Sequence, residues 1–119
     1  MRRGELWWSN IPSSGDPHLV LLLSWDAGEG IRDRVTVALV TRTIRGIDAE
    51  VHLDRSDGVR EPCVVNLDNM ATVPYSVFKR DGRISQLSEA KMLEVARAAH
   101  LALGFRLPCP LRQGHRALL

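Results

Sequence analysis

The sequence has few cysteines and no long apolar run, and each shortage excludes a class of protein. Its 119 residues include only Cys63 and Cys109, which are too few and too far apart for a disulfide framework or a zinc site. The longest apolar run, at residues 19–23, is much shorter than the roughly 20 residues that cross a bilayer. Charged and polar residues also interrupt the N-terminal segment, so no signal sequence is predicted. We therefore expect a cytoplasmic protein that is not anchored in a membrane.

An excess of positive charge is also missing. Lys and Arg total 16 against 14 for Asp and Glu, a net charge of only +2, which is weak evidence for nucleic-acid binding. The basic residues are arginines except for Lys79 and Lys91. Arginine suits planar contacts with phosphate, but GC-rich coding raises its frequency as well, so composition leaves both explanations open.

What is present is the composition of one folded domain. Hydrophobic residues make up 45% and charged residues 25%, and 119 residues suffice for one core without metal or disulfide support. Seven short segments show the alternating or continuous apolar pattern of strands. They are residues 5–9, 18–24, 34–41, 49–53, 63–67, 71–73 and 83–86.

From Leu87 the apolar spacing becomes helical. Ser88 is a suitable cap for a helix over residues 88–103, and Gly104 is a suitable C-terminal stop. The predicted buried face of this helix consists of Met92, Val95, Ala96, Ala99 and Leu103. We therefore expect a mainly β (α+β) fold, a curved antiparallel sheet or half-barrel packed on a C-terminal helix, over residues 1–105. Residues 106–119 show no periodicity and are predicted to form an irregular tail.

Three segments carry a more specific signal. Residues 1–8 (MRRGELWW) resemble the R-G-[ED]-[IVL]-[WY] opening of MazF/PemK-type toxins. Residues 64–73 (VVNLDNMATV) resemble that family's V-V-N-x-[DE]-[QN]-[IV]-x-T-[IVL] segment. Residues 83–88 (RISQLS) and the amphipathic helix after them are the third match. Each segment alone is weak, but together and in order they make the resemblance specific over about residues 2–105.

The resemblance implies a PemK/CcdB-like fold, an SH3-like half-barrel, in agreement with the pattern analysis. It also implies a homodimer and a metal-independent endoribonuclease that cleaves single-stranded RNA, with no cofactor. An antitoxin of the MazE kind is the implied protein partner, and it would block the active surface. The expected function is that of a growth-inhibiting toxin of a toxin–antitoxin module.

The resemblance also indicates catalytic positions. The family's usual pair is an arginine that opens the second strand, in the context R-P-x-[VL]-[VI], and a Thr or Ser that closes the third. Thr41 matches the second position, but His18 and Leu19 stand where Arg and Pro are expected. Histidine titrates near neutral pH, so His18 is predicted to transfer protons while Arg42 or Arg45 supplies fixed positive charge. A purely structural His18, bonded to a backbone group at the start of a strand, is the alternative.

Further residues are candidates for RNA contact. Arg45 would bind phosphate, Trp25 could stack on the face of a base, and Arg34 is a further candidate for RNA binding. Asn69 could bind a base edge, or Asp68-Asn69 could simply shape a turn. Trp7 and Trp8 alternate across the first strand, so one should enter the core while the other is free to stack on a base. The acidic residues form no cation site, and we expect Asp54, Asp57 and Glu61 to be solvated charges.

Two other classes of function stay open. A CcdB-like toxin shares the fold and acts on a topoisomerase, but its C-terminal Trp-Gly-Ile tail has no counterpart after Leu103. A non-catalytic SH3-like binding module is expected if His18 cannot replace the family's arginine.

Overall fold

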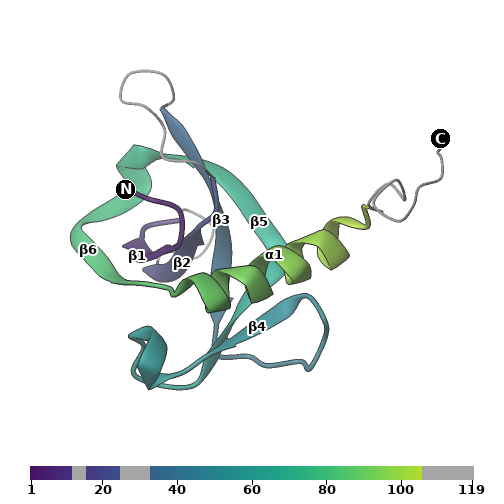
Figure 1. Cartoon of the computed structure of the whole chain (residues 1–119). Helices are drawn as coiled ribbons and strands as arrows, with labels where there is room; N and C mark the ends of the chain where they lie inside the picture. The colour runs from purple at the N-terminus through teal and green to yellow at the C-terminus, as the bar shows by residue number, and fades with distance from the viewer. Residues whose placement is uncertain (12–15, 25–32, 106–119) are drawn as a thin grey trace.

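Six antiparallel strands and one helix form the described part of the chain, residues 1–11, 16–24 and 33–105 of a computed structural model (Figure 1). The strands form one curved sheet in the order β4-β5-β3-β2-β1-β6. Their bounds are β1 Glu5–Ser9, β2 His18–Leu22, β3 Arg34–Thr41, β4 Glu50–Leu53, β5 Cys63–Pro74 and β6 Phe78–Gln86. The helix α1 spans Glu89–Leu103, and the 3-10 turns η1 and η2 span Arg55–Asp57 and Tyr75–Val77. The predicted fold class is confirmed.

The predicted number of strands was wrong by one. The segments 63–67 and 71–73 are parts of the single strand β5, which follows β3 along its whole length. A register shift opposite Ala38 and Leu39 absorbs the extra residues of β5, so the polar residues between the two segments do not end the strand. The last strand also begins earlier than predicted, at Phe78, and Asp81-Gly82 lies inside β6 with Asp81 at φ 57°. The predicted tail at residues 106–119 lies outside the described residues.

The sheet buries apolar side chains on both of its faces. Leu21 contributes to the cluster beneath α1, whereas its neighbours Val20 and Leu22 contribute to a second cluster with Val35 and Val37. The prediction that the apolar run of the second strand is buried on both faces is therefore confirmed. β2 stops at Leu22, two residues before the predicted end.

Helix α1 has the predicted caps but a narrower buried face. The Ser88 hydroxyl accepts a hydrogen bond from the backbone N–H of Lys91, and Gly104 ends the helix at φ 74°. Met92, Val95 and Ala99 pack against the sheet as predicted, together with Ala98 and Ala102. Ala96 and Leu103 were assigned to this face wrongly, because only a strip of the helix meets β4 and β5, and both residues are exposed.

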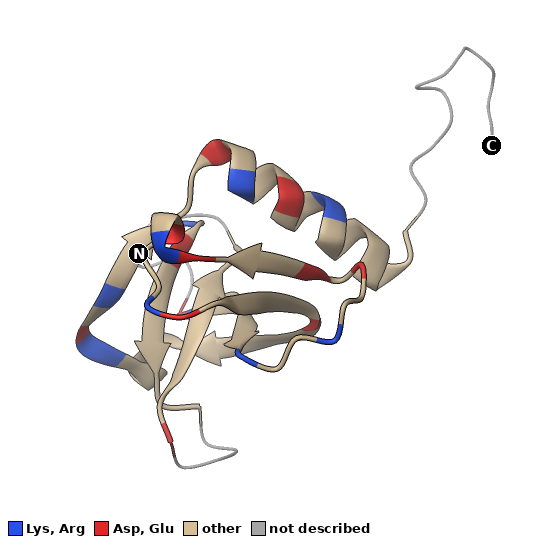
Figure 2. Ribbon diagram, turned by 90° about the horizontal axis from the view of Figure 1, so that it is seen from below, with Lys and Arg blue, Asp and Glu red and all other residues tan. Residues whose placement is uncertain are grey.

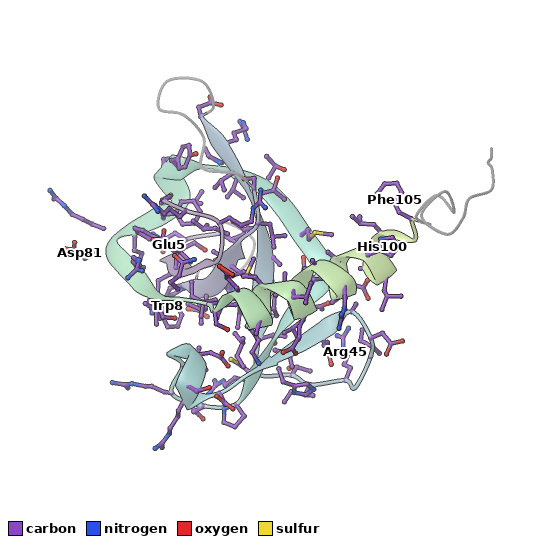
Figure 3. The ribbon with its side chains drawn as sticks, in the orientation of Figure 1. Glu5, Trp8, Arg45, Asp81, His100 and Phe105 are labelled. Atoms are coloured by element: carbon purple, nitrogen blue, oxygen red, sulfur yellow. The ribbon has the colours of Figure 1, made fainter. Side chains whose placement is uncertain are left out.

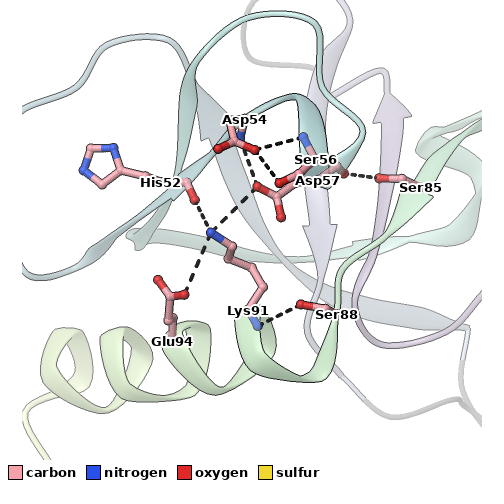
Figure 4. A network of polar contacts seen from close by, with 8 residues as sticks. All are labelled: His52, Asp54, Ser56, Asp57, Ser85, Ser88, Lys91 and Glu94. Atoms are coloured by element: carbon pink, nitrogen blue, oxygen red, sulfur yellow. Dashed lines mark hydrogen bonds and ion pairs between the residues drawn. The ribbon is translucent and has the colours of Figure 1, made fainter.

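A polar network joins the start of α1 to the turn after β4 (Figure 4). Lys91 Nζ donates to the backbone carbonyl of His52 at 2.9 Å and lies 3.7 Å from Asp57 Oδ2. The Asp57 carboxylate also accepts the backbone N–H of Asp54 at 2.9 Å, which closes a capping box around η1. Asp57 is therefore buried and paired, and its prediction as a solvated charge was wrong. The network fixes the segment that follows, residues 58–61.

Glu5 fixes the other side of the sheet, where β1 meets β6. Its buried carboxylate accepts hydrogen bonds from the backbone of Arg2 at 2.9 Å, from Trp7 Nε1 at 3.0 Å and from Arg83 Nε at 2.7 Å. Burial raises the pKa of Glu5, but the hydrogen bonds outweigh it, and the net pKa is lowered.

The lowered pKa of Glu5 predicts a loss of stability in acid. The ionised carboxylate stabilises the fold above its unfolded-state pKa, and this contribution is lost as the pH falls through the lower folded-state pKa. Glu5→Gln is expected to lower the free energy of unfolding at pH 7 by about 1–3 kcal/mol. It should also flatten the decline of stability toward acid. Urea denaturation at a series of pH values measures both effects, and parallel curves for the variant and the unaltered chain would contradict the assignment.

Candidate active site

An open groove lies where the start of β2 meets the end of β3. It has a volume of about 810 Å³ and draws its lining from β1, β2, β3, β5, β6 and residues 58–61. Its polar and aromatic lining residues are Trp8, His18, Thr41, Arg42, Arg60 and Glu61. Three of these, His18, Thr41 and Arg42, are the predicted catalytic residues, so the structure brings all three into one groove.

His18 and Thr41 reach the groove from the ends of two neighbouring strands. β2 and β3 run antiparallel, with Val20 opposite Leu39 and Leu21 opposite Ala38. The paired residues end at Val20 and Leu39, and two residues beyond them at the same end of the two strands lie His18, the first residue of β2, and Thr41, the last residue of β3. Both residues line the groove, so their side chains can act on one bound group.

Strand β1 contributes an aromatic side chain to the groove. Trp8 pairs with Leu19 of β2, lines the groove and is 39% exposed (Figure 3). Trp7 points to the opposite face, where its ring meets the Phe78 ring edge-on at a centroid distance of 5.9 Å. The alternation predicted for the two tryptophans is therefore confirmed, and Trp8 is the one available to a ligand.

A charged pair stands at the rim of the groove. Arg42 Nη1 lies 3.1 Å from Glu61 Oε2, and the two side chains are 75% and 64% exposed. The Thr41 hydroxyl accepts a hydrogen bond from the backbone N–H of Thr43 at 3.1 Å, which bends the chain just after β3 and turns it into the next loop. Arg60, next to Glu61, is a second arginine in the lining.

Glu50 organises the loop that follows Arg42. Its buried carboxylate accepts the backbone N–H groups of Arg45, Gly46 and Ile47 at 2.9–3.4 Å, and Gly46 takes φ 75° to permit this arrangement. Burial works to raise the pKa of Glu50, but the three backbone hydrogen bonds lower it overall. The loop therefore has a fixed course, although its side chains are exposed.

The remaining predicted RNA contacts do not line this groove. Arg45 is exposed on that loop and lies apart from Trp8 in Figure 3, toward the C-terminal half of α1. Arg34 begins β3, opposite Pro74, and is thus at the far end of that strand from Thr41. Asn69 is exposed in the register shift of β5, and Trp25 lies outside the described residues.

Sequence reasoning missed Arg60 and dismissed Glu61 as a solvated charge. Neither residue belongs to a motif, and both reach the groove only because the turn at Gly58 carries residues 58–61 back toward β2 and β3. Gly58 has φ 94°, and a Cβ atom there would lie 2.5 Å from the Ser85 side chain. The sequence does contain the Asp57-Gly58 turn signal, but not the destination of the chain after it.

Charge over the described part of the chain is mixed rather than uniformly basic. Figure 2 shows acidic and basic residues alternating along α1 and basic ones spaced along β6. Among the described residues, no three His, Cys, Asp or Glu side chains gather into a group that could hold a metal ion. None of the described helices is long and apolar enough to span a membrane.

Comparison with known proteins identifies close similarities over nearly the whole described chain. Residues 2–103 match the family described as the PemK-like, MazF-like toxin of type II toxin-antitoxin system. A relative from Mycobacterium tuberculosis, the probable endoribonuclease MazF2, is 38% identical over 108 residues, which cover 87% of this chain and 99% of the relative. Another, the probable endoribonuclease MazF5 of the same species, is 34% identical and covers 85% of this chain and 91% of the relative.

Solved structures show the same similarity in three dimensions. The Mycobacterium tuberculosis toxin MazF-mt6 superposes with a TM-score of 0.76 at 27% identity, covering 87% of this chain and 99% of that one. An endoribonuclease in complex with its cognate antitoxin, from a mycobacterial species, gives a TM-score of 0.77. Because its identity is 23%, over 91% of this chain and 99% of that one, it shows likeness of fold alone.

Proposed function

The chain belongs to the PemK-like, MazF-like toxins of type II toxin–antitoxin systems, and from this premise we propose that its groove cleaves single-stranded RNA. Its curated relatives are endoribonucleases, and so is this chain. The observation that carries the assignment of the site is the single groove that His18, Thr41 and Arg42 line together.

RNA supplies its own nucleophile, the 2′-hydroxyl next to each phosphate. Cleavage then needs removal of the 2′ proton, stabilisation of the extra negative charge on phosphorus and protonation of the leaving 5′ oxygen. His18 transfers protons, Arg42 stabilises the phosphate charge, and the Thr41 hydroxyl positions the phosphate by a hydrogen bond. The products are a 2′,3′-cyclic phosphate and a 5′-hydroxyl, and the chemistry assigns no step to a metal ion.

Substrate contacts extend beyond the reacting phosphate. Trp8 offers its exposed ring to a base, and Arg60 offers its charge to a neighbouring phosphate. We expect Arg45, further along the loop that begins at Arg42, to contact a flanking nucleotide. As RNA contacts, Arg34, Asn69 and Trp25 stay predictions, and the RNA sequence selected by the enzyme would depend on such flanking residues.

Incubation of the purified protein with a defined RNA in EDTA tests the function. The proposal predicts discrete fragments rather than a smear, since a sequence-selective nuclease without a metal requirement cuts at few sites. Intact RNA would support the non-catalytic binding module instead. Inhibition of a purified topoisomerase by the same preparation would support a CcdB-like action.

The protein partners follow from the family. Solved relatives include MazE–MazF complexes from Deinococcus radiodurans and the mycobacterial complex with its cognate antitoxin. We propose that a MazE-like antitoxin binds this chain too and covers the groove, and that the toxin acts in the cytoplasm, where it meets RNA. Growth inhibition would then depend on loss of the antitoxin.

We also propose that two copies associate. Helix α1 and the short segment after it leave large apolar side chains uncovered, a feature typical of an interaction surface. Leu93, Leu101, Leu103 and Phe105 are 54%, 58%, 55% and 67% exposed. A dimer would bring together the arginines of both copies, so the positive charge available to bind RNA would be larger than the modest net charge of one chain suggests.

Leu101→Glu is expected to shift the dimer toward monomer, because a carboxylate in an apolar interface loses its hydration. Light scattering at micromolar concentration measures the change, and Lys79→Glu, an exposed charge change on β6, is the control. A monomeric unaltered protein would contradict the dimer, and a dimeric Leu101→Glu variant would contradict the involvement of α1.

A further inference from the structure

We propose that Glu61 is a further catalytic residue, the general base that accepts the proton of the 2′-hydroxyl, and that His18 is the general acid. The inference rests on the proposed endoribonuclease function and divides its two proton transfers between two residues. It assigns a role to a carboxylate that no motif marks and that the sequence analysis predicted to be only solvated.

The geometry of the reaction requires two separate groups. The 2′ oxygen attacks phosphorus on one side while the 5′ oxygen leaves on the opposite side. A group that accepts a proton at the first oxygen and a group that donates one at the second must therefore stand on two sides of the phosphate. One imidazole cannot be in both places or in both protonation states in the same step.

Few of the described lining groups can accept a proton near neutral pH. Arg42 and Arg60 stay cationic, and burial raises the pKa of the Cys63 thiol, with Asp57 adding to the effect, so that the thiol keeps its proton. The Thr41 hydroxyl is too weak an acid to exist as a base. Among the described residues of the groove, these eliminations leave only His18 and Glu61 for proton transfer.

The position of Glu61 fits the role of the base. Its Oε2 atom lies 3.1 Å from Nη1 of Arg42. The guanidinium of Arg42 is the group assigned to the reacting phosphate. A guanidinium carries five N–H donors, so Arg42 can keep this contact while it donates to a phosphate oxygen. Phosphate and carboxylate would then share one arginine, which brings the carboxylate beside the ribose that bears the 2′-hydroxyl.

Glu61 lies among basic side chains in the groove. Besides the Cys63 thiol, which keeps its proton, the charged and titratable groups that line the groove with it are Arg42 after β3, Arg60 next to it in sequence, and His18 on β2. All three are positive or become positive on protonation. The backbone that carries Glu61 is fixed by the Gly58 turn and by the contact of Asp57 with Lys91 at 3.7 Å. The base is therefore held on a defined segment.

The step balances without any co-reactant. The 2′ O–H proton passes to a Glu61 carboxylate oxygen, and the 2′ oxygen uses the freed electron pair to bond to phosphorus. The phosphorus–5′ oxygen bond breaks, and the departing oxygen takes a proton from the His18 imidazolium. Glu61 ends protonated and His18 neutral, and exchange of one proton with water restores both residues.

The same ion pair has a competing explanation, in which Glu61 only occupies the place of a phosphate on Arg42 and slows RNA binding. Glu61→Gln separates the two. As the base, Glu61 contributes to the rate of the chemical step, so the variant should cleave about 10²–10³-fold more slowly. It should also lose the acid limb of the pH profile of kcat/KM, and it should bind a non-cleavable 2′-deoxy analogue at least as tightly as before. Glu61→Asp should retain part of the rate, and Glu89→Gln, on the first turn of α1, is the control.

A substrate with sulfur in place of the 5′ bridging oxygen gives a second, sharper measurement. Thiolate leaves without a proton, so this substrate should restore the rate of His18→Gln but not that of Glu61→Gln. Three results would overturn the role of Glu61 while the endoribonuclease function stands. The sulfur-substituted substrate could restore the cleavage rate of Glu61→Gln, or Glu61→Gln could cleave ordinary RNA at the rate of the unaltered protein or faster. Failure of the unaltered protein to cleave RNA would overturn the proposed function, and the role of Glu61 with it.

Discussion

Replacing Arg42 with alanine is expected to slow RNA cleavage by about 10²–10³-fold, which is the usual effect of removing one group that stabilises transition-state charge. The Arg42 side chain is largely exposed, and its ion pair with Glu61 lies at the rim of the groove. The fold should therefore be unaffected, and the loss should fall on kcat more than on KM. Single-turnover cleavage of a short RNA, with circular dichroism as a check on folding, measures the change.

Arg45→Ala is the matched control for this prediction. It removes an equal charge from the same loop, but Arg45 does not line the groove, and its backbone rather than its side chain holds the loop to Glu50. We expect a change of less than about tenfold, concentrated in KM and reduced at high salt, as for a flanking phosphate contact. Equal effects of the two substitutions would contradict a direct role for Arg42 at the reacting phosphate.

Val95→Asp is expected to unfold the domain. Val95 is 2% exposed at the centre of the α1 face that covers the sheet, and an unpaired carboxylate there loses its hydration with no compensating partner. The cost is comparable with the whole stability of a domain of this size, about 5–15 kcal/mol. Thermal melting followed by circular dichroism should show no cooperative transition for this variant.

The neighbouring position supplies the control. Ala96 is exposed, although the apolar spacing alone placed it on the buried face. Ala96→Asp should therefore lower the stability by no more than about 1 kcal/mol, through helix propensity alone. A cooperative, native-like melting curve for Val95→Asp, or loss of folding in Ala96→Asp, would contradict the orientation of α1.

The helix illustrates how far sequence patterns reach. Its caps, Ser88 and Gly104, are local chemistry, and both were predictable. The width of its buried face depends on how the helix crosses β4 and β5, and this is set by the curvature of the sheet. Apolar spacing records only that one side is covered, so it could not distinguish Val95 from Ala96.

Local patterns could not predict that β5 is one continuous strand, for a similar reason. The polar residues between Leu67 and Ala71 look like a break, but β3 supplies pairing partners on both sides of them, and a register shift accommodates the extra length. Burial of Asp57 is also non-local, because its partner Lys91 comes from the helix more than thirty positions later in the chain. Such contacts exist only once the topology is known.

The residues of the groove show the same difference between local patterns and non-local contacts. The presence of His18 and Thr41 in one groove was predictable because a family pattern marks the ends of two strands, and these ends are neighbours in the antiparallel sheet. Arg60 and Glu61 enter the groove through the turn at Gly58, and no pattern in the sequence marks that path. Residues placed by motif could be predicted, whereas residues placed by topology could not.

The central claim is that the 2′-hydroxyl of the RNA is the nucleophile in the groove that holds His18, Thr41 and Arg42. A short RNA with a single 2′-deoxy nucleotide on the 5′ side of the cut tests it most directly. The account predicts that this substrate resists cleavage in EDTA, while the all-ribose RNA yields a 2′,3′-cyclic phosphate and a 5′-hydroxyl. Cleavage of the deoxy-substituted RNA at the same site, or products with a 3′-hydroxyl and a 5′-phosphate, would contradict it.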